Sequence, residues 1–457
     1  MSAPAPRRLP AVGESRGIHF PPIAKHTRAD GSRVWTVAHR GLPVVCLSVL
    51  YPIGSAGDPV DRFGLTSLTA DLLDEGTRTL DGLALHDALA RLGSHLEGEV
   101  GPDAAAIGLV TLSRNGDRAT ALLADVACHP RFDPADFARV RDNRVSRLVQ
   151  MRDVPAAVAE RVFSQQLYGA HPYGHSPVGV ESSLRDTTLD DVRRFHEEVL
   201  LATTPTIMAV GDVAHEVVVR WVDAVWPTRQ GTPPPPVPAV ASVALPRGPS
   251  LSLVHRAGAA QSELRVGRVA AARSTPDYAS LAVMNTILGG TFVSRINSKL
   301  REEKGFTYGV RSTFDYRREP GPFAVQTSVQ ASATAEAIAD ILTEIRGIGG
   351  DRPATAAEIA RAQAALTRSY PRSFETAEQV TRAVAQIALH GLPDDYFDGF
   401  VRDVSLVTAE QVSDVARRYA AADDLHVVVV GDRSHLAGDM PGTLGLGPVV
   451  ERPLSDD

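Results

Sequence analysis

The chain has 457 residues, a net charge of −7 and 44% hydrophobic residues, which together favour two or three globular domains. The acidic balance and the lack of a basic stripe exclude nucleic acid as the main partner. No run of about 18 apolar residues occurs, so we expect no membrane span, and no apolar leader follows Met1. Cys46 and Cys128 are too few for a Cys-rich zinc site and favour a reducing compartment, the cytoplasm.

Strands and helices are predicted in both halves of the chain. Runs of apolar and β-branched residues predict strands over 44–51 and 105–112. Helical spacing of apolar residues predicts helices over 117–127, 156–168, 188–199, 335–347, 356–369 and 409–420. Because the strands come in runs and do not alternate strictly with helices, we expect α+β domains rather than a doubly wound sheet.

A proline-rich linker divides the chain near its middle. Pro233 to Pro236, followed by Val237 and Pro238, favour extended polyproline geometry, which cannot carry a packed core. The C-terminal stretch is rich in Gly and Pro, so we expect it to be flexible. The sequence therefore predicts a first domain over 16–228, a linker over 229–249, a second domain over 250–436 and a flexible tail over 437–457.

The two predicted domains carry the same signals in the same order. Residues 206–212 and 425–432 are both buried-strand patterns that end in Gly-Asp. Upstream of each lies a capping-box signature, one beginning at Thr188 and the other at Thr408. A repeat this long is not a solenoid period, so it indicates a duplicated domain of roughly 200 residues.

Several stretches carry a family resemblance that covers most of residues 18–436. They include Gly-Ser-Ala-Gly-Asp-Pro at 54–59, the helix from Gly64 to Thr77, and Leu-Arg-Glu-Glu-Lys-Gly-Phe-Thr-Tyr at 300–308. In this order they resemble the M16 family of zinc peptidases, which includes pitrilysin, insulin-degrading enzyme and mitochondrial processing peptidase. The resemblance implies two homologous M16-type α+β domains that close like a clamshell around a chamber.

Active members of that family carry His-x-x-Glu-His on the first helix. Histidines four residues apart lie on one helical face and can hold one zinc ion, while the glutamate activates the metal-bound water. At the matching positions this chain has Ser67, Ala70 and Asp71, and residues 140–151, where a third ligand is expected, contain no glutamate. The sequence therefore predicts a degenerate zinc site, no metal bound by this chain and no catalytic residue of its own.

The string at 300–308 resembles the family's Arg/Tyr substrate-binding motif, which assigns Arg301 and Tyr308 to substrate binding. We expect Gly305 to end the helix and Tyr308 to lie on the next strand. A guanidinium can donate to a peptide carbonyl or carboxylate, and a phenol can donate to the oxyanion formed during hydrolysis. The alternative is a surface charge and a half-buried aromatic ring.

Two histidine-containing segments admit other interpretations. His171 and His175 are four residues apart, but Pro172 and Gly174 place them in a loop, which favours a structural role. His95, Glu97 and Glu99 fall on one face of a predicted strand. In the family this strand lines the substrate chamber, so we interpret it as an acidic wall that favours basic peptides, with a solvated edge strand or a metal site as alternatives.

These observations lead to one functional hypothesis and two alternatives. The first is a non-catalytic, substrate-binding subunit of a heterodimeric M16B zinc peptidase, whose partner carries His-x-x-Glu-His and the zinc. Arg301 and Tyr308 would then act on an unfolded peptide at the partner's zinc site. The second is an assembly core of M16 type with no peptidase role. The third is an enzyme with an altered site built on Asp71, Asp74 or His95.

Overall fold

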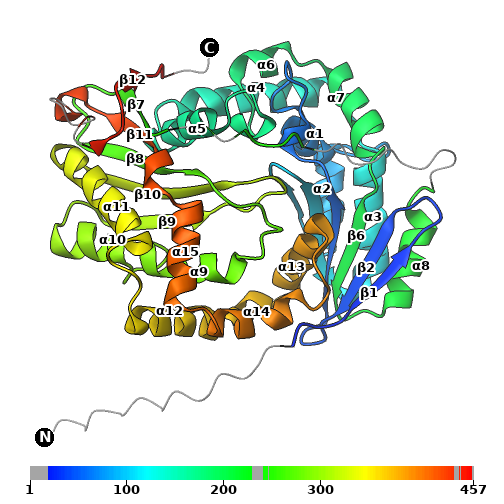
Figure 1. The fold of residues 1–457 in the computed structure, drawn as a ribbon. Helices are drawn as coiled ribbons and strands as arrows, with labels where there is room; N and C mark the ends of the chain where they lie inside the picture. The colour runs from blue at the N-terminus through cyan, green and yellow to red at the C-terminus, as the bar shows by residue number, and fades with distance from the viewer. Residues whose placement is uncertain are drawn as a thin grey trace, which may run out of the picture.

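The computed structural model describes residues 19–228, 240–244, 246, 248–436, 442 and 444–454. Most of the predicted linker, residues 229–249, therefore lies outside the described residues. On either side of it the chain forms two α+β halves, each built on one six-stranded sheet. The halves face each other, with helices lying between and around them (Figure 1).

The first sheet has the strand order β1-β2-β6-β3-β5-β4. Strand β2 runs parallel to β6, and the other neighbours are antiparallel. The strands have these bounds: β1 Ile23–Thr27, β2 Arg33–Ala38, β3 Val44–Tyr51, β4 Leu96–Val100, β5 Ala105–Leu112 and β6 Thr206–Gly211.

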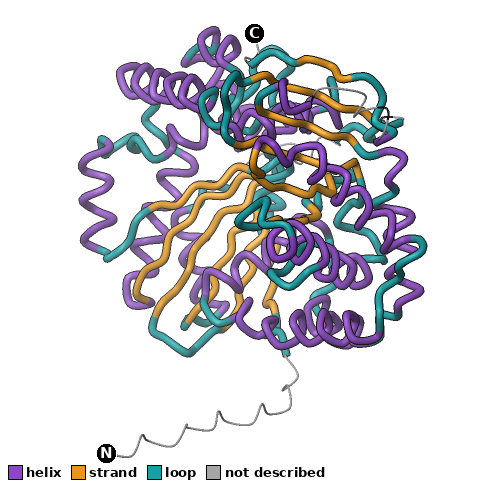
Figure 2. The backbone as a smooth tube through the Cα atoms, turned by 90° about the vertical axis from the view of Figure 1, so that its left-hand side faces the viewer, coloured by secondary structure: helices purple, strands orange, loops and turns teal. Residues whose placement is uncertain are grey.

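The second sheet repeats this arrangement with the order β12-β7-β11-β8-β10-β9. Strand β7 runs parallel to β11, as β2 does to β6, so five strands of each sheet correspond in order and direction. The edge strands differ, because β12 runs parallel to β7, whereas β1 is antiparallel to β2. The strands have these bounds: β7 Ser250–His255, β8 Gln261–Val269, β9 Val310–Phe314, β10 Pro322–Gln330, β11 His426–Gly431 and β12 Val449–Glu451. In the view turned by 90°, strands run side by side as sheets with helices around them (Figure 2).

Helices occupy most of the remaining described chain. In the first half they are α1 Leu65–Leu73, α2 Gly82–Arg91, α3 Gly116–Cys128, α4 Pro134–Met151, α5 Pro155–Tyr168, α6 Glu181–Asp186, α7 Leu189–Phe195 and α8 His215–Val225. In the second half they are α9 Tyr278–Leu288, α10 Arg295–Asn297, α11 Thr334–Gly349, α12 Ala356–Ser369, α13 Ala377–His390, α14 Tyr396–Ser405 and α15 Ala409–Tyr419. A π-helical turn, η5 Ser298–Glu303, continues α10.

Each half has its own core, but the inner face of each sheet is covered by a helix from the other half. Helix α5, from the first half, packs Val158 and Phe163 against Val254 and Val428 of the second sheet. The corresponding helix of the second half, α13, packs on the first sheet, and Figure 1 shows it lying there. This second contact joins Val380, Val384 and Ile387 to Trp35, Cys46, Leu50 and Met208.

A polar contact at Asp103 also joins the halves. The Tyr173 hydroxyl donates to Asp103 Oδ1 (2.6 Å), and the backbone N–H of Arg318 donates to Asp103 Oδ2 (2.8 Å). Arg318 belongs to the β9–β10 connection of the second half, whereas Asp103 and Tyr173 belong to the first. The Asp103 carboxylate therefore accepts one hydrogen bond from each half.

Local sequence signals account well for the individual elements. Strands β3 and β5 have the predicted bounds, and each predicted helix is found within a few residues of its predicted range. The capping boxes at Thr188 and Thr408 are both present, with the N3 side chain accepting from the cap's backbone N–H. None of the helices in the described ranges is long and apolar enough to cross a membrane.

The C-terminal tail differs from expectation. The sequence predicts a flexible tail over 437–457, yet β12 (Val449–Glu451) pairs in parallel with β7. The backbone N–H of Arg452 also donates to Leu253 O (2.8 Å). The free edge of β7 offers unpaired backbone groups, and the tail satisfies them although its composition is poor in strand formers.

Because α5 packs on the sheet of the other half, a cavity in that helix should weaken both halves together. Phe163 is fully buried, so we expect Phe163→Ala to lower the free energy of unfolding by about 3–5 kcal/mol. Urea denaturation followed by circular dichroism measures this loss. Leu83→Ala is the control, because Leu83 is 77% exposed and should change stability little. A loss below about 1 kcal/mol for Phe163→Ala would contradict the described packing.

Candidate functional site

Helix α1, which carries the predicted degenerate zinc positions Ser67, Ala70 and Asp71, is capped by a residue that precedes the helix. Its N-cap residue, Gly64, has no side chain, and Asp58 takes over the capping role. The Asp58 carboxylate, which is fully buried, accepts from the backbone N–H groups of Gly64 and Thr66 (2.7 Å each) and from the Thr66 hydroxyl (2.6 Å). His175 lies 3.3 Å from the same carboxylate and stacks on Phe63. His175 thus supports the start of α1.

Helix α1 keeps an apolar face but presents no metal-binding face. Leu65, Leu68, Leu72 and Leu73 are buried in the core of the first half. Ser67 and Asp71 are contacted by a different side chain, the Arg144 guanidinium from α4. Its Nη2 donates to Ser67 O (3.1 Å) and to the Asp71 carboxylate, and its Nη1 donates to Val178 O (3.3 Å).

These residues do not fit a catalytic zinc ion. A serine, an alanine and one carboxylate replace two imidazoles and a glutamate base. Of these three side chains only Asp71 is charged, and it is paired with Arg144, whose side chain is only 10% exposed. A guanidinium is always charged, so its presence repels a metal cation from this face of α1. Helix α1 of this chain therefore lacks the groups that would hold a zinc ion and activate its bound water.

The alternative site based on Asp71, Asp74 or His95 is not supported by the geometry. Burial raises the pKa of the Asp74 carboxyl, which lies 3.7 Å from His86 Nε2. His95 is largely exposed and pairs with Glu97 (3.0 Å). Within the described ranges, no three His, Cys, Asp or Glu side chains come together as a metal site would require.

His171 belongs to the loop between α5 and α6. Its Nδ1 accepts from the backbone N–H of Tyr173 (3.0 Å), which caps a short 3₁₀ turn at Pro172–Gly174. Its Nε2 lies 2.7 Å from Ala241 O. Both ring nitrogens of His171 are therefore engaged with the backbone, as a structural residue requires.

A cavity of about 1120 Å³ lies between the inner face of the first sheet and α13. Glu97 and Glu99 of edge strand β4 line it, opposite residues of the β9–β10 connection such as Arg317. Cys46 also lines it, and burial raises the pKa of this thiol to about 11, so it stays protonated near neutral pH. Arg301 and Tyr308 are not among the lining residues.

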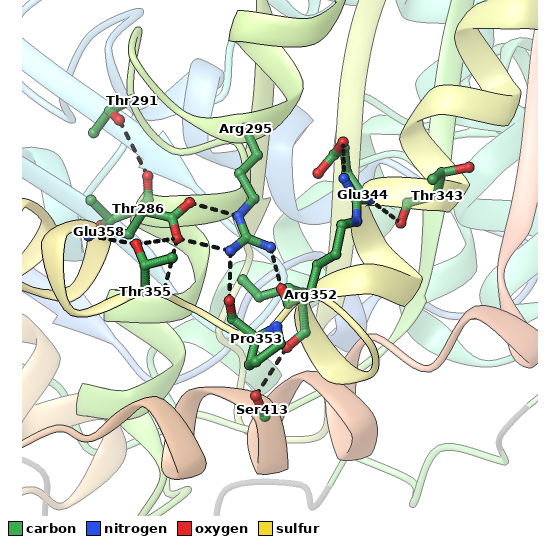
Figure 3. A network of polar contacts seen from close by, with 11 residues as sticks. Thr286, Thr291, Arg295, Thr343, Glu344, Arg352, Pro353, Thr355, Glu358 and Ser413 are labelled. Carbon is green, nitrogen blue, oxygen red and sulfur yellow. Dashed lines mark hydrogen bonds and ion pairs between the residues drawn. The ribbon is translucent and has the colours of Figure 1, made fainter.

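Arg301 lies on η5, which continues α10 as one helical segment over residues 295–303. The first residue of this segment, Arg295, anchors it to α12. Arg295 donates from Nε to Glu358 Oε1 (2.7 Å) and from Nη2 to Glu358 Oε2 (2.8 Å), which makes a bidentate ion pair. It also donates to Arg352 O (2.6 Å) and Pro353 O (3.0 Å). Figure 3 shows these contacts converging on one guanidinium. Glu358 is at the same time the N3 residue of the α12 capping box, with Thr355 as N-cap.

Two further contacts hold this segment and the loop that follows it. The Asn297 side chain donates to Val310 O (2.6 Å) and accepts from Val310 N (2.8 Å), which ties the helical segment to β9. Lys304 donates to Glu336 and Asp340 of α11 (2.6 Å each). The loop between these anchors carries Tyr308 and is held in place from both sides.

Tyr308 itself lies outside the strand on which it was predicted. Strand β9 begins two residues later, at Val310, so the prediction was wrong on this point. Gly305 has a φ of +66°, and Thr307 exchanges hydrogen bonds with Gly309 before the chain becomes extended. Tyr308 is 93% exposed, whereas Arg301 is 30% exposed in its side chain.

Three polar contacts around α1 and α10 were not predicted from the sequence. Asp58 lies six residues before Gly64, so it does not fit the spacing of a helix cap. Arg144 is one of several arginines on α4, and nothing in the sequence distinguishes it. The Arg295–Glu358 pair joins residues 63 positions apart, although the capping-box pattern at Thr355 could have marked Glu358 as part of a helix start.

Comparison with known proteins settles the family. Residues 33–179 match the family model described as insulinase (peptidase family M16), and residues 186–366 match the peptidase M16 inactive domain. The chain belongs to the M16 family. The crystal structure of a peptidase M16 inactive domain from Pseudomonas fluorescens superposes with a TM-score of 0.82 at 26% identity, over 90% of this chain and 98% of that one.

The curated relatives include proteins named as zinc proteases and one named as a non-peptidase homolog. An uncharacterized zinc protease of Mycobacterium leprae is 23% identical over 90% of this chain and 93% of its own length. A non-peptidase homolog of Helicobacter pylori is 21% identical over 86% of this chain and 90% of its own length. With Ser67, Ala70 and Asp71 on α1 and the match to the inactive domain, this chain is a non-catalytic M16 member.

The Arg144–Asp71 pair should contribute to stability. Asp71→Asn removes the charge that Arg144 faces and leaves a largely buried guanidinium bonded only to carbonyl oxygens. We expect a loss of about 1–3 kcal/mol in the free energy of unfolding, measured by urea denaturation. Asp87→Asn on the exposed side of α2 is the matched control. Equal stability of the two variants would show that the ion pair does not hold α1 to α4.

The Arg295–Glu358 pair should make stability depend on pH in acid. The hydrogen bond from Arg295 lowers the pKa of Glu358 from 4.5 to about 2. The carboxylate therefore stabilises the fold above about pH 4.5, and this contribution is lost as the pH falls towards 2. We expect Glu358→Gln to cost about 2 kcal/mol at pH 7, a difference that shrinks between pH 4.5 and 2. The exposed Glu410→Gln is the control, and a difference independent of pH would contradict the assignment.

Proposed function

We propose that this chain is the substrate-binding, non-catalytic subunit of a heterodimeric M16B zinc peptidase. The observation that carries the proposal is the exposure of Tyr308 on a loop that is anchored at both ends. An exposed tyrosine adds little to the stability of its own chain, and anchoring its backbone has a clear use if a second chain must meet the phenol in a fixed place. The face of α1, by contrast, has been closed by Arg144.

The two side chains would divide the work on a bound peptide. Arg301 presents guanidinium donors that suit a peptide carbonyl or carboxylate. The Tyr308 O–H would donate to the oxyanion that develops on the scissile carbonyl. The partner subunit would carry His-x-x-Glu-His and supply the zinc that activates water. Arg301 and Tyr308 do not line the cavity between the halves of this chain, so the shared site would form between the two subunits.

Substrate and compartment follow as further parts of the proposal. A site enclosed between two subunits admits an unfolded peptide and excludes a folded protein. Glu97 and Glu99, on the exposed edge strand β4, would favour peptides with basic side chains. Cys46 and Cys128 are both buried free thiols, which suits a reducing compartment such as the cytoplasm.

A second candidate function is an assembly core of M16 type. The Arg144–Asp71 contact favours it, because that pair ties α1 to α4 without any metal and so suits a purely structural role. The two candidates differ in what the chain binds. Affinity purification of the tagged chain from its native cell should recover an M16 protein with His-x-x-Glu-His under the first proposal, and no such protein under the second.

Replacing Tyr308 with phenylalanine should lower the activity of the assembled peptidase. If the phenol donates to the oxyanion, Tyr308→Phe reduces turnover of an internally quenched peptide by roughly 10²-fold, with little change in KM. Arg301→Ala should chiefly raise KM, because it removes a substrate contact. Both are measured on the heterodimer recovered from the native cell.

Arg114→Ala, at an exposed position of the first half, is the arginine control. The isolated chain should neither bind stoichiometric zinc nor cleave the peptide, and the mixture with its partner should cleave it. Unchanged kinetics for both Tyr308→Phe and Arg301→Ala would remove these residues from the reaction.

A further inference from the structure

An exposed phenylalanine lies directly against Arg301. Phe292 follows α9 in a short turn and is 61% exposed, so it contributes little to the core. Its ring centroid is 3.7 Å from Cζ of Arg301, the distance of direct stacking between a guanidinium and a ring face. The Arg301 side chain also forms an ion pair with the neighbouring Glu302 (2.7 Å), which is exposed and therefore weak.

The turn that presents Phe292 is rigidly built. A Cβ at Gly289 would approach Ser312 Oγ to 2.6 Å, and one at Gly290 would approach Asn285 Nδ2 to 2.9 Å, so the turn fits closely against its surroundings. Thr291 is held by Asn297, whose Nδ2 donates to Thr291 O (3.1 Å). The same Asn297 ties the segment to β9, so Phe292 and the Tyr308 loop share one anchor.

Stacking on a ring is well suited to positioning a guanidinium that must bind a ligand. The five N–H donors of arginine lie in the plane of the group, whereas the stacking contact uses only its face. Phe292 can therefore restrict the rotamers of Arg301 without consuming a donor, which lowers the conformational entropy lost when a peptide binds. A hydrogen-bonding neighbour in the same place would compete with the substrate.

We propose that Phe292 is a positioning residue, which holds the Arg301 guanidinium in the orientation that receives a peptide carbonyl or carboxylate. The inference rests on the proposed function of Arg301. Phe292 would act through Arg301 and would not touch the reacting atoms. Its loss should therefore raise KM and leave kcat almost unchanged.

The kinetic test uses three variants of the assembled peptidase and an internally quenched peptide. Phe292→Leu keeps apolar bulk but removes the ring, and we expect KM to rise roughly 3- to 10-fold with kcat within about 2-fold of wild type. Phe292→Trp keeps a ring face and should preserve the wild-type KM. Val293→Ala is the matched control, because Val293 is the adjacent residue and is 71% exposed.

A chemical test on the isolated chain needs no partner. Phenylglyoxal modifies accessible guanidinium groups, and peptide mapping by mass spectrometry follows Arg301 separately from the exposed Arg114. Because the Phe292 ring covers one face of Arg301, we expect Phe292→Leu to speed modification of Arg301 several-fold relative to Arg114, and Phe292→Trp to leave it unchanged. Equal rates in wild type and Phe292→Leu would overturn the contact.

The outcomes separate this inference from the function on which it rests. If Arg301→Ala leaves KM unchanged, the proposed function of Arg301 fails. If Arg301→Ala raises KM but Phe292→Leu does not, Arg301 binds substrate without help from Phe292, and the inference alone fails. If Phe292→Leu and Phe292→Trp raise KM equally, the ring face is not what positions Arg301, and the inference fails as well.

Discussion

The architecture depends on how the inner faces of the two sheets are covered. Each sheet packs one face on the helices of its own half, which leaves a second apolar face that water would otherwise reach. Helices α5 and α13 are exchanged between the halves to cover these faces. The burial that stabilises one half is thus supplied by the other, and the orientation of the halves is fixed by the same contacts that complete their cores.

This exchange leaves the two halves free to diverge in chemistry while sharing a scaffold. In the first half, α1 carries Ser67, Ala70 and Asp71 and is contacted by Arg144. The Arg144–Asp71 pair is costly to break from one side, because the largely buried guanidinium would be left without its counter-charge, whereas the half-exposed Asp71 carboxylate can be solvated by water. In the second half, Arg295 and Glu358 at one end and Lys304 at the other hold the segment of Arg301 and the loop of Tyr308.

Much of the fold could be predicted from sequence, because its determinants are local. The capping boxes at Thr188 and Thr408 and the Gly-Asp strand ends indicated both helices, both central strands and the duplication. The partners of α5 and α13 could not be predicted, since an apolar helical face does not say which sheet it meets. The strand after Gly305 was placed two residues too early, because the side-chain hydrogen bonds of Thr307 delay the extended backbone.

The candidate site was predictable where it depends on residue types and not where it depends on long-range contacts. The loss of imidazoles at Ser67 and Asp71 is visible in the sequence alone, whereas the choice of Arg144 as their neighbour requires the packing of α4 on α1. Phe292 gave no signal, because a phenylalanine in a turn is normally read as a core residue and its exposure appears only in three dimensions.

The arginine that closes α1 has a consequence for how the chain responds to its surroundings. A guanidinium is covalently part of the protein, so chelators cannot extract it and metal starvation cannot leave the helix without its counter-charge. The conformation of α1 in this chain is thereby independent of the supply of zinc. Depletion of zinc would therefore leave the contacts between Arg144 and α1 unchanged.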